Sequence, residues 1–119
     1  MPWDVEYADE FFAWWGGLDQ QEETVVAVAV EYLAERGPTL GRPFVETLSG
    51  SRHPNMKELR PKGGHLRILF AFDPRRLAIL LIGGDKTGEW SAWYRRMIPI
   101  ADELDDEHLE TLKSEGLLP

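Results

Sequence analysis

The sequence predicts an α+β fold in which helices cover one face of a small antiparallel sheet. Two stretches with helical patterning come first, three strand-like runs follow between residues 56 and 82, and helical periodicity returns after residue 88. Helices and strands that are grouped rather than strictly alternating are typical of this class. The 119 residues are 43% apolar and 29% charged, which is a globular balance, so we expect a single domain over residues 1–119.

The first two predicted elements are a short strand and a short helix. Residues 3–7 alternate apolar and polar side chains, which is the period of a strand with one buried face. Residues 10–15 follow Asp9 and end before a Gly-Gly pair. Three large apolar side chains share one side of this helix at spacings of three and four residues, namely Phe11, Trp14 and Trp15.

A longer helix is predicted over residues 20–36. Asp19 and Glu22 form a capping-box pattern at its start, and Gly37 followed by proline marks its end. Residues 25–30 have strong β propensity, so a strand is the alternative there. The length of the segment and the signals at both ends favour the helix. Its buried side is then formed by Val26, Ala29, Val30 and Leu33.

Two strands of a meander follow a turn-rich segment. Residues 38–54 are rich in Gly and Pro, with a short extended piece at 44–48. Strands are predicted over 56–60 and 66–72, joined by a Pro-Lys-Gly-Gly turn. In the second strand Ile68, Phe70 and Phe72 face one way, and Arg67, Leu69 and Ala71 face the other.

The last strand leads into the C-terminal helical region. Residues 77–82 are apolar on both faces, so this strand is central in the sheet, and the glycine-rich segment 83–88 ends it. Helical character begins at Glu89, Pro99 is expected to break or restart the helix, and the final helix ends near Gly116. One face of the sheet is then covered by helices and the other is partly free.

Composition excludes several classes of protein. The chain has no cysteine, which excludes disulfide frameworks, Cys zinc sites and thiol catalysis. The three histidines are scattered, so no metal site is expected. No apolar run approaches the roughly 18 residues that cross a bilayer. The acidic N-terminal segment lacks the basic region of a signal peptide, so we expect a cytoplasmic protein.

Charge is strongly segregated along the chain. Residues 1–35 contain nine acidic and no basic side chains, residues 36–96 contain twelve Lys or Arg and five acids, and residues 97–119 contain one Lys and seven acids. A centre of +7 therefore lies between flanks of −9 and −6, which sum to the net charge of −8. Because the local field decides whether a polyanion docks, the centre predicts a nucleic-acid partner. The alternative is a solvated, Arg-rich region of strands and turns.

The meander brings one carboxylate and two guanidiniums to the same face. Period two places Glu58 and Arg60 on the face opposite Leu59. Arg67 lies opposite Ile68 in the next strand, so it shares that open face if the apolar side chains pack inward. Arginine binds phosphate in bidentate fashion and a carboxylate accepts a proton, which suits a phosphodiester substrate. The alternative is a cross-strand salt bridge that stabilises the hairpin slightly.

Three further residues are candidates for chemistry. The Gly-Gly-Asp-Lys-Thr-Gly segment lacks the spacing of a phosphate-binding loop, but it brings Lys86 to the rim of the open face unless it is a plain turn. His53 is either an RNA contact or proton carrier, or an exposed loop histidine. Tyr94 has helical spacing with Trp90 and Trp93, so these rings either stack on bases or form the core stripe of a helix.

Three segments around the meander carry a family resemblance. They are RHPNMKELR at 52–60, GGHLRILFAFD at 63–73 and LIGGDK at 81–86. These motifs resemble the RelE/ParE toxin superfamily and look closest to its HigB-like branch, which is related to phage Gp49. The resemblance covers about residues 3–100. It implies a RelE-like β-α-α-β-β-β fold with a C-terminal helix, and the toxin of a type II toxin–antitoxin pair.

The family also implies an activity and partners. Most RelE and HigB relatives cut mRNA in the ribosomal A site without a metal, so the resemblance implies an mRNA endonuclease that inhibits translation and needs no cofactor. ParE relatives inhibit DNA gyrase instead. A non-enzymatic gyrase inhibitor and an inactive phage-derived domain therefore remain alternatives. The implied partners are the ribosome, mRNA and a small helix-turn-helix antitoxin whose acidic or helical segment covers the basic face, with no membrane.

The implied reaction is attack of the RNA 2′-OH on the adjacent phosphorus. Glu58 or His53 would accept the 2′ proton, and Tyr94 or His53 would protonate the leaving 5′ oxygen. The charge on the phosphorane would be stabilised by Arg60, Arg67 and Lys86. RelE has lysines on this face where the present chain has Met56 and Glu58. The other basic side chains expected to contact RNA are Arg52, Lys57, Lys62, Arg75 and Arg76.

Overall fold

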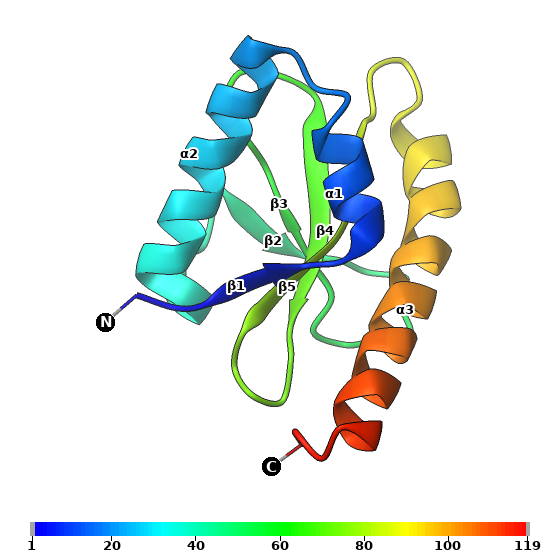
Figure 1. Ribbon diagram of the computed structural model, residues 1–119. Helices are drawn as coiled ribbons and strands as arrows, with labels where there is room; N and C mark the ends of the chain where they lie inside the picture. The colour runs from blue at the N-terminus through cyan, green and yellow to red at the C-terminus, as the bar shows by residue number, and fades with distance from the viewer. Residues whose placement is uncertain (1, 119) are drawn as a thin grey trace.

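The computed structural model describes residues 2–118, which form one five-stranded sheet with helices on both faces (Figure 1). The strand order is β1-β5-β4-β3-β2. The elements are β1 (Val5–Tyr7), α1 (Asp9–Trp15), α2 (Gln20–Arg36), a 3₁₀ turn (Gly37–Thr39), β2 (Val45–Thr47), β3 (Lys57–Leu59), β4 (Leu66–Phe72), β5 (Ala78–Asp85) and α3 (Trp90–Ser114). The α+β class and the predicted order are confirmed, and β2 occupies the short extended piece of the turn-rich segment.

The sheet is mixed rather than wholly antiparallel. Strand β1 pairs with β5 in parallel, with Val5 opposite Ala78, whereas the other neighbouring pairs are antiparallel. A parallel pair needs a long crossover connection, and the helices and strands between β1 and β5 supply it. The prediction of an antiparallel sheet was therefore wrong at this edge.

Helix α2 begins and ends where its sequence signals predict. The Asp19 side chain accepts a 2.8 Å hydrogen bond from the backbone N–H of Glu22, and the Glu22 side chain accepts one of 2.9 Å from the N–H of Asp19. At the other end Gly37 adopts a φ of +54°, and its N–H donates to the carbonyl of Leu33. Because both ends are satisfied, the β-prone valines between them remain helical.

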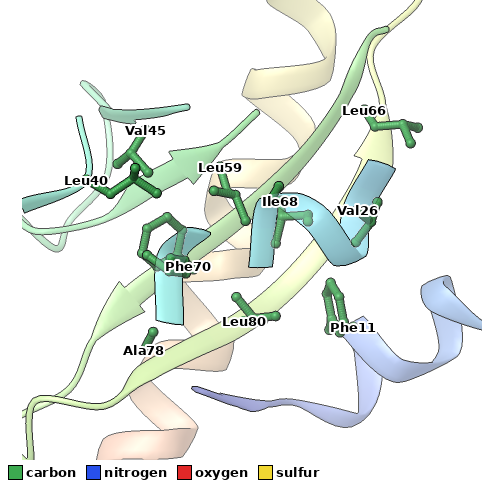
Figure 2. Close-up of a cluster of buried hydrophobic side chains, with 12 residues drawn as sticks. Phe11, Val26, Leu40, Val45, Leu59, Leu66, Ile68, Phe70, Ala78 and Leu80 are labelled. Carbon is green, nitrogen blue, oxygen red and sulfur yellow. The ribbon is translucent and has the colours of Figure 1, made fainter. Parts of the chain in front are cut away.

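The first hydrophobic core lies between the sheet and helices α1 and α2 (Figure 2). Phe11 of α1 and Val26 of α2 pack in the same cluster as Ile68 and Phe70 of β4. All four side chains are at most 5% exposed. The predicted alternation of β4 is confirmed, because the intervening Leu69 belongs to a separate core on the opposite face.

Helix α3 covers the second face of the sheet, which was expected to be partly free. Trp93 of α3 is 1% exposed and packs with Leu69 and Leu81, which are both fully buried. The expectation was wrong because β4 and β5 are apolar on both faces. A stripe at four-residue spacing on α3, formed by Trp93, Met97 and Ala101, buries the second of these faces. The face predicted to present open guanidiniums therefore lies beneath a helix.

Helix α3 is continuous through Pro99, where a break was predicted. Proline removes one backbone hydrogen bond and usually kinks a helix. Here Ile98 and Ala101, which flank the exposed Pro99, are buried in the same core. Packing on both sides of the proline therefore maintains a single helix of 25 residues. No helix within residues 2–118 is long and apolar enough to cross a membrane.

Strand β5 continues through Gly83 and Gly84, which were predicted to lie in a turn. A Cβ atom at Gly83 would lie 2.2 Å from the ring of Trp14, and one at Gly84 would lie 2.7 Å from the ring of Trp93. The missing side chains let one indole pack on each face of the strand. As a result β5 is longer than predicted, and Lys86 follows directly after it.

Candidate active site

Five of the six side chains predicted to take part in chemistry lie together beside the first turns of α3. They come from β3 and the residue after it, from β4, from the residue after β5, and from α3 itself. These residues are Glu58, Arg60, Arg67, Lys86 and Tyr94.

The carboxylate of Glu58 is the centre of the cluster. Glu58 pairs with Leu69 in the sheet, so its side chain projects toward α3, and it is only 3% exposed. One carboxylate oxygen accepts a 2.6 Å hydrogen bond from the hydroxyl of Tyr94. The other accepts hydrogen bonds of 3.0 and 2.8 Å from Nε and Nη2 of Arg60. Burial of this charge is therefore compensated by three donors.

Arg67 lies on the predicted face of β4, but it is not open to solvent. Its side chain is 11% exposed, and its Nε lies 3.7 Å from Glu58 without a hydrogen-bond partner in the described chain. Its Nη1 donates to the carbonyl of Leu66 at 2.7 Å. The parity argument placed Arg67 on the correct face, and the packing of α3 on that face made the expectation of exposure wrong.

Lys86 is held inside the cluster and is not carried on a flexible rim. Its backbone N–H donates to the carbonyl of His65 at 3.0 Å, and the residue is 4% exposed. Its ammonium donates to the Tyr94 hydroxyl at 3.3 Å and lies 3.9 Å from the centre of the Trp90 ring. The aromatic residues of this helix differ in their surroundings. Trp93 belongs to the core, whereas Trp90 is 54% exposed beside the site.

Burial changes the acidity of two groups in the cluster. Burial and the hydrogen bond to Glu58 raise the pKa of the Tyr94 phenol to about 12. Burial and the nearby charge of Arg67 lower the pKa of the Lys86 ammonium from its usual value. Tyr94 therefore stays protonated at neutral pH, while Lys86 gives up its proton more readily than an exposed lysine does.

A cavity of about 550 Å³ opens beside these groups, between the β2–β3 edge of the sheet and α3. Arg60, Lys86 and Tyr94 line it, so that two cations and a phenol face the cavity beside the carboxylates of Glu46 and Glu58. The wall also contains hydroxyl groups, which belong to Thr47, Ser49 and Ser91. Cations and hydroxyl donors around one cavity can hold a phosphate group and stabilise added negative charge on it.

His53, the sixth predicted residue, lies elsewhere. Its ring nitrogens face two carboxylates of α3, Asp105 at 3.4 Å and Asp106 at 2.8 Å. Asp105 follows Tyr94 by eleven residues in α3, about 16 Å along a helix that rises about 1.5 Å per residue. The expectation that His53 joins Glu58 and Tyr94 was therefore wrong, because the His53 ring is held by the carboxylates of Asp105 and Asp106 instead.

The five residues expected to contact RNA do not form one surface. Arg52 pairs with Asp106 at 2.7 Å, and Arg75 pairs with Glu6 at 2.9 Å. Lys57 donates to Thr47 and lies on the opposite face of β3 from Glu58. The remaining two occupy separate turns, Lys62 between β3 and β4, and Arg76 between β4 and β5. The acidic flanks thus neutralise part of the basic centre once the chain is folded.

One residue of the site was missed by the sequence reasoning. Glu46 in β2 accepts a hydrogen bond from Arg60 and forms an ion pair with Arg42, and so links the edge strand to the cluster. The available signal was the short extended piece predicted at 44–48, which contains Glu46. In the structure Val45 is buried, Glu46 is half-buried and Thr47 is exposed. Within residues 2–118, no three His, Asp or Glu side chains are arranged to bind one metal ion.

Comparison with known protein families gives one match that covers most of the chain. Residues 13–105 match the family described as phage derived protein Gp49-like. The chain is 53% identical over 100 residues to HigB2 of Mycobacterium tuberculosis, and 51% identical over 96 residues to HigB3 of the same organism. Both relatives are named as candidate toxins. The matches cover 82% and 81% of this chain. The chain spans about half the length of the first relative and 84% of the second.

Several solved structures with the same fold are RelE proteins. The RelE–RelB complex of Pyrococcus horikoshii has a TM-score of 0.59 at 16% identity, and the match covers 75% of this chain and 99% of that one. A mutant of Escherichia coli RelE in the free state has a TM-score of 0.59 at 11% identity, with coverages of 76% and 90%. The RelBE2 toxin–antitoxin complex of M. tuberculosis has a TM-score of 0.56 at 18% identity, with coverages of 71% and 99%. These similarities show a common fold.

Proposed function

The chain belongs to the phage-derived Gp49-like family and has the fold of the RelE proteins, and from this premise we propose that it is the toxin of a type II toxin–antitoxin pair that cleaves mRNA on the ribosome. Its HigB relatives are named as candidate toxins, and two of the similar structures are RelE proteins bound to their antitoxins. These names support a toxin with a cognate antitoxin. The observation that carries the cleavage proposal is the convergence of Arg60, Lys86, Tyr94 and Glu58 on one cavity.

In the proposed reaction the 2′ oxygen of the substrate attacks the adjacent phosphorus. The bond from the 2′ oxygen to phosphorus forms and the bond to the 5′ oxygen breaks, which leaves a 2′,3′-cyclic phosphate and a 5′-hydroxyl. The step needs no cofactor because the nucleophile belongs to the substrate. Arg60 and Lys86 stabilise the negative charge that develops on the phosphorane, which is commonly the largest contribution to such catalysis.

Proton transfer is assigned to the groups that the hydrogen bonds connect. The Tyr94 hydroxyl donates to Glu58 and accepts from Lys86, so its second lone pair can accept the 2′ proton while its own proton passes to the carboxylate. The Lys86 ammonium, whose pKa is lowered by burial, protonates the leaving 5′ oxygen. Both carboxylate oxygens of Glu58 already accept hydrogen bonds from Tyr94 and Arg60, which favours this relay over direct proton abstraction by Glu58. His53 has no role in the proposed mechanism, because its ring contacts Asp105 and Asp106.

The proposal is tested with ribosomes programmed with a defined mRNA and the purified protein. We expect cuts with 2′,3′-cyclic phosphate ends, and no cut at a position that carries a single 2′-deoxy substitution. Normal cleavage of the 2′-deoxy substrate would exclude the 2′ oxygen as nucleophile. Chelator is expected not to slow cleavage of pre-formed complexes, which must be used because ribosome integrity requires magnesium.

Expression in bacteria separates the alternatives. Growth arrest with cut mRNA supports the proposal. Growth arrest with intact mRNA and inhibited gyrase would replace the proposed activity with a ParE-like one. Normal growth at a verified protein level would identify an inactive phage-derived domain.

A further inference from the structure

An apolar groove of about 350 Å³ lies between helices α1 and α2, on the opposite side of the sheet from the cavity that contains Glu58 and Tyr94. Its floor is formed by Phe11 and Leu80, and its walls include Phe12 of α1 and Val30 of α2. Figure 1 shows both helices on the same face of the sheet. None of the side chains assigned to the proposed reaction lines this groove.

Two aromatic rings at the groove are exposed to solvent. Tyr7 is 56% exposed and Phe12 is 59% exposed, and their rings stack with centroids 5.7 Å apart. A single exposed apolar side chain is ordinary in a folded protein. A stacked aromatic pair at the mouth of an apolar groove is instead typical of a surface that a protein partner covers.

The surface around the groove is acidic. Residues 1–35, which form β1, α1 and most of α2, contain nine acidic side chains and no Lys or Arg. Glu31 lines the groove itself, and Glu6, Asp9 and Glu10 belong to the strand and helix beside it. Of these four carboxylates only Glu6 is ion-paired within residues 2–118, with Arg75. A partner that fills the groove must therefore bring positive charge to the rim and apolar side chains to the centre.

The basic face, which was expected to bind the antitoxin, has several of its cations already paired or buried. Arg60 and Arg52, which belong to the basic centre, are already paired with Glu58 and Asp106. Lys86 and Arg67 are buried beneath α3. Among residues 2–118 the two most exposed aromatic side chains, Phe12 and Tyr7, lie on the N-terminal face.

We propose that this groove is the docking site of the cognate antitoxin, which inserts apolar side chains from an amphipathic segment flanked by Lys or Arg. The inference rests on the proposed function, because it assigns the occupant as the antitoxin of a toxin. The antitoxin then binds on the acidic face of the sheet, and the catalytic cavity contributes nothing to its affinity. Complementary charge sets the orientation and the association rate of the pair, and the apolar side chains at the centre provide most of the affinity.

The test uses the full chain and the protein encoded by the gene adjacent to its own. The double variant Tyr7→Ser/Phe12→Ser is expected to raise the Kd of the pair by about a hundredfold in calorimetry. The charge reversal Glu31→Lys is expected to raise the Kd less and to weaken its dependence on salt. Leu117→Ser is the matched control, because Leu117 is 47% exposed at the far end of the chain, and its Kd is expected to equal that of the wild type.

In cells the groove variants are expected still to arrest growth, and the antitoxin no longer to restore it. Thermal unfolding verifies that each variant is folded. Wild-type affinity of both groove variants, or the absence of binding between the wild-type chain and the neighbouring protein, would overturn the inference. A dimer of the free chain that the groove variants convert to monomer would assign the groove to a second copy. Absence of RNA cleavage with intact antitoxin binding would contradict the proposed activity but not the docking site.

Discussion

The hydroxyl of Tyr94 donates a 2.6 Å hydrogen bond to the buried carboxylate of Glu58. The two residues are 36 positions apart in the chain. The bond connects the first turns of α3 to an inner strand of the sheet, at the point where Arg60 and Lys86 also meet. A carboxylate, a phenol and two cations are thereby held in fixed positions around one cavity.

Tyr94→Phe removes the hydroxyl and leaves one oxygen of Glu58 without its donor. We expect RNA cleavage to fall by about a hundredfold or more, which is the usual contribution of a positioned acid or base. The free energy of unfolding is expected to decrease by about 1.5–3 kcal/mol, as for hydrogen bonds to charged groups. Tyr32→Phe is the control, since Tyr32 is 38% exposed and contacts Phe44. Full cleavage by the folded Tyr94→Phe protein would contradict the proposed relay.

Alkaline pH is expected to weaken the fold through Tyr94. Its pKa is about 12 in the folded protein, compared with the ordinary tyrosine value of 10.0. Between these values the folded state retains a proton that the unfolded state has lost. The stabilisation is therefore complete below pH 10 and is lost as pH rises through about 12. Urea unfolding at about pH 9 and pH 12 should show a loss about 2 kcal/mol larger in the wild type than in Tyr94→Phe. Equal losses would count against the raised pKa.

The pH dependence of cleavage is expected to report on Lys86. Burial and the charge of Arg67 lower its pKa below 10.5, so the rate should fall with rising pH earlier than an exposed lysine would allow. Lys86→Arg retains the charge but donates a proton poorly, so cleavage should be slower and this fall should disappear. Single-turnover rates across the alkaline range measure both effects. An unchanged profile in Lys86→Arg would remove Lys86 from the proton-transfer step.

Gly83→Ala is expected to destabilise the fold, because the new methyl group would lie 2.2 Å from the ring of Trp14. Overpacking of this kind costs about 1–3 kcal/mol or more. Gly64→Ala is the matched control, because nothing lies within 4 Å of a Cβ atom there. Chemical denaturation of both variants makes the comparison. Similar stabilities would show that Trp14 moves freely.

His53→Ala is expected to leave cleavage within about threefold of the wild-type rate, because the ring lies far from Tyr94 along α3. The free energy of unfolding should fall by about 1 kcal/mol, since Asp105 and Asp106 lose a partner. Cleavage assays and urea unfolding on the same preparation separate the two effects. A folded but inactive His53→Ala protein would return His53 to the mechanism.

Much of the fold follows from patterns within short segments. The capping box of Asp19 and Glu22 and the glycine at position 37 determine the limits of α2. Period-two alternation in β4 separates Ile68 and Phe70 from Arg67 and Leu69. These features depend on neighbouring residues along the chain, and so the sequence alone determines them. For the same reason the shared face of Glu58 and Arg67 could be predicted from parity.

The tertiary structure decided what covers that face and which charges meet. The apolar stripe of α3 was predictable as a helix, but its packing on the second face of the sheet depends on how the whole chain folds. The same packing brings Tyr94 to Glu58 and carries Asp106 to Arg52 and His53. Pairs of charges separated by many residues compete for partners, and the outcome depends on distances that no local pattern encodes. Sequence patterns therefore identified most of the residues in the cluster, and the packing of α3 determined which of them share a cavity.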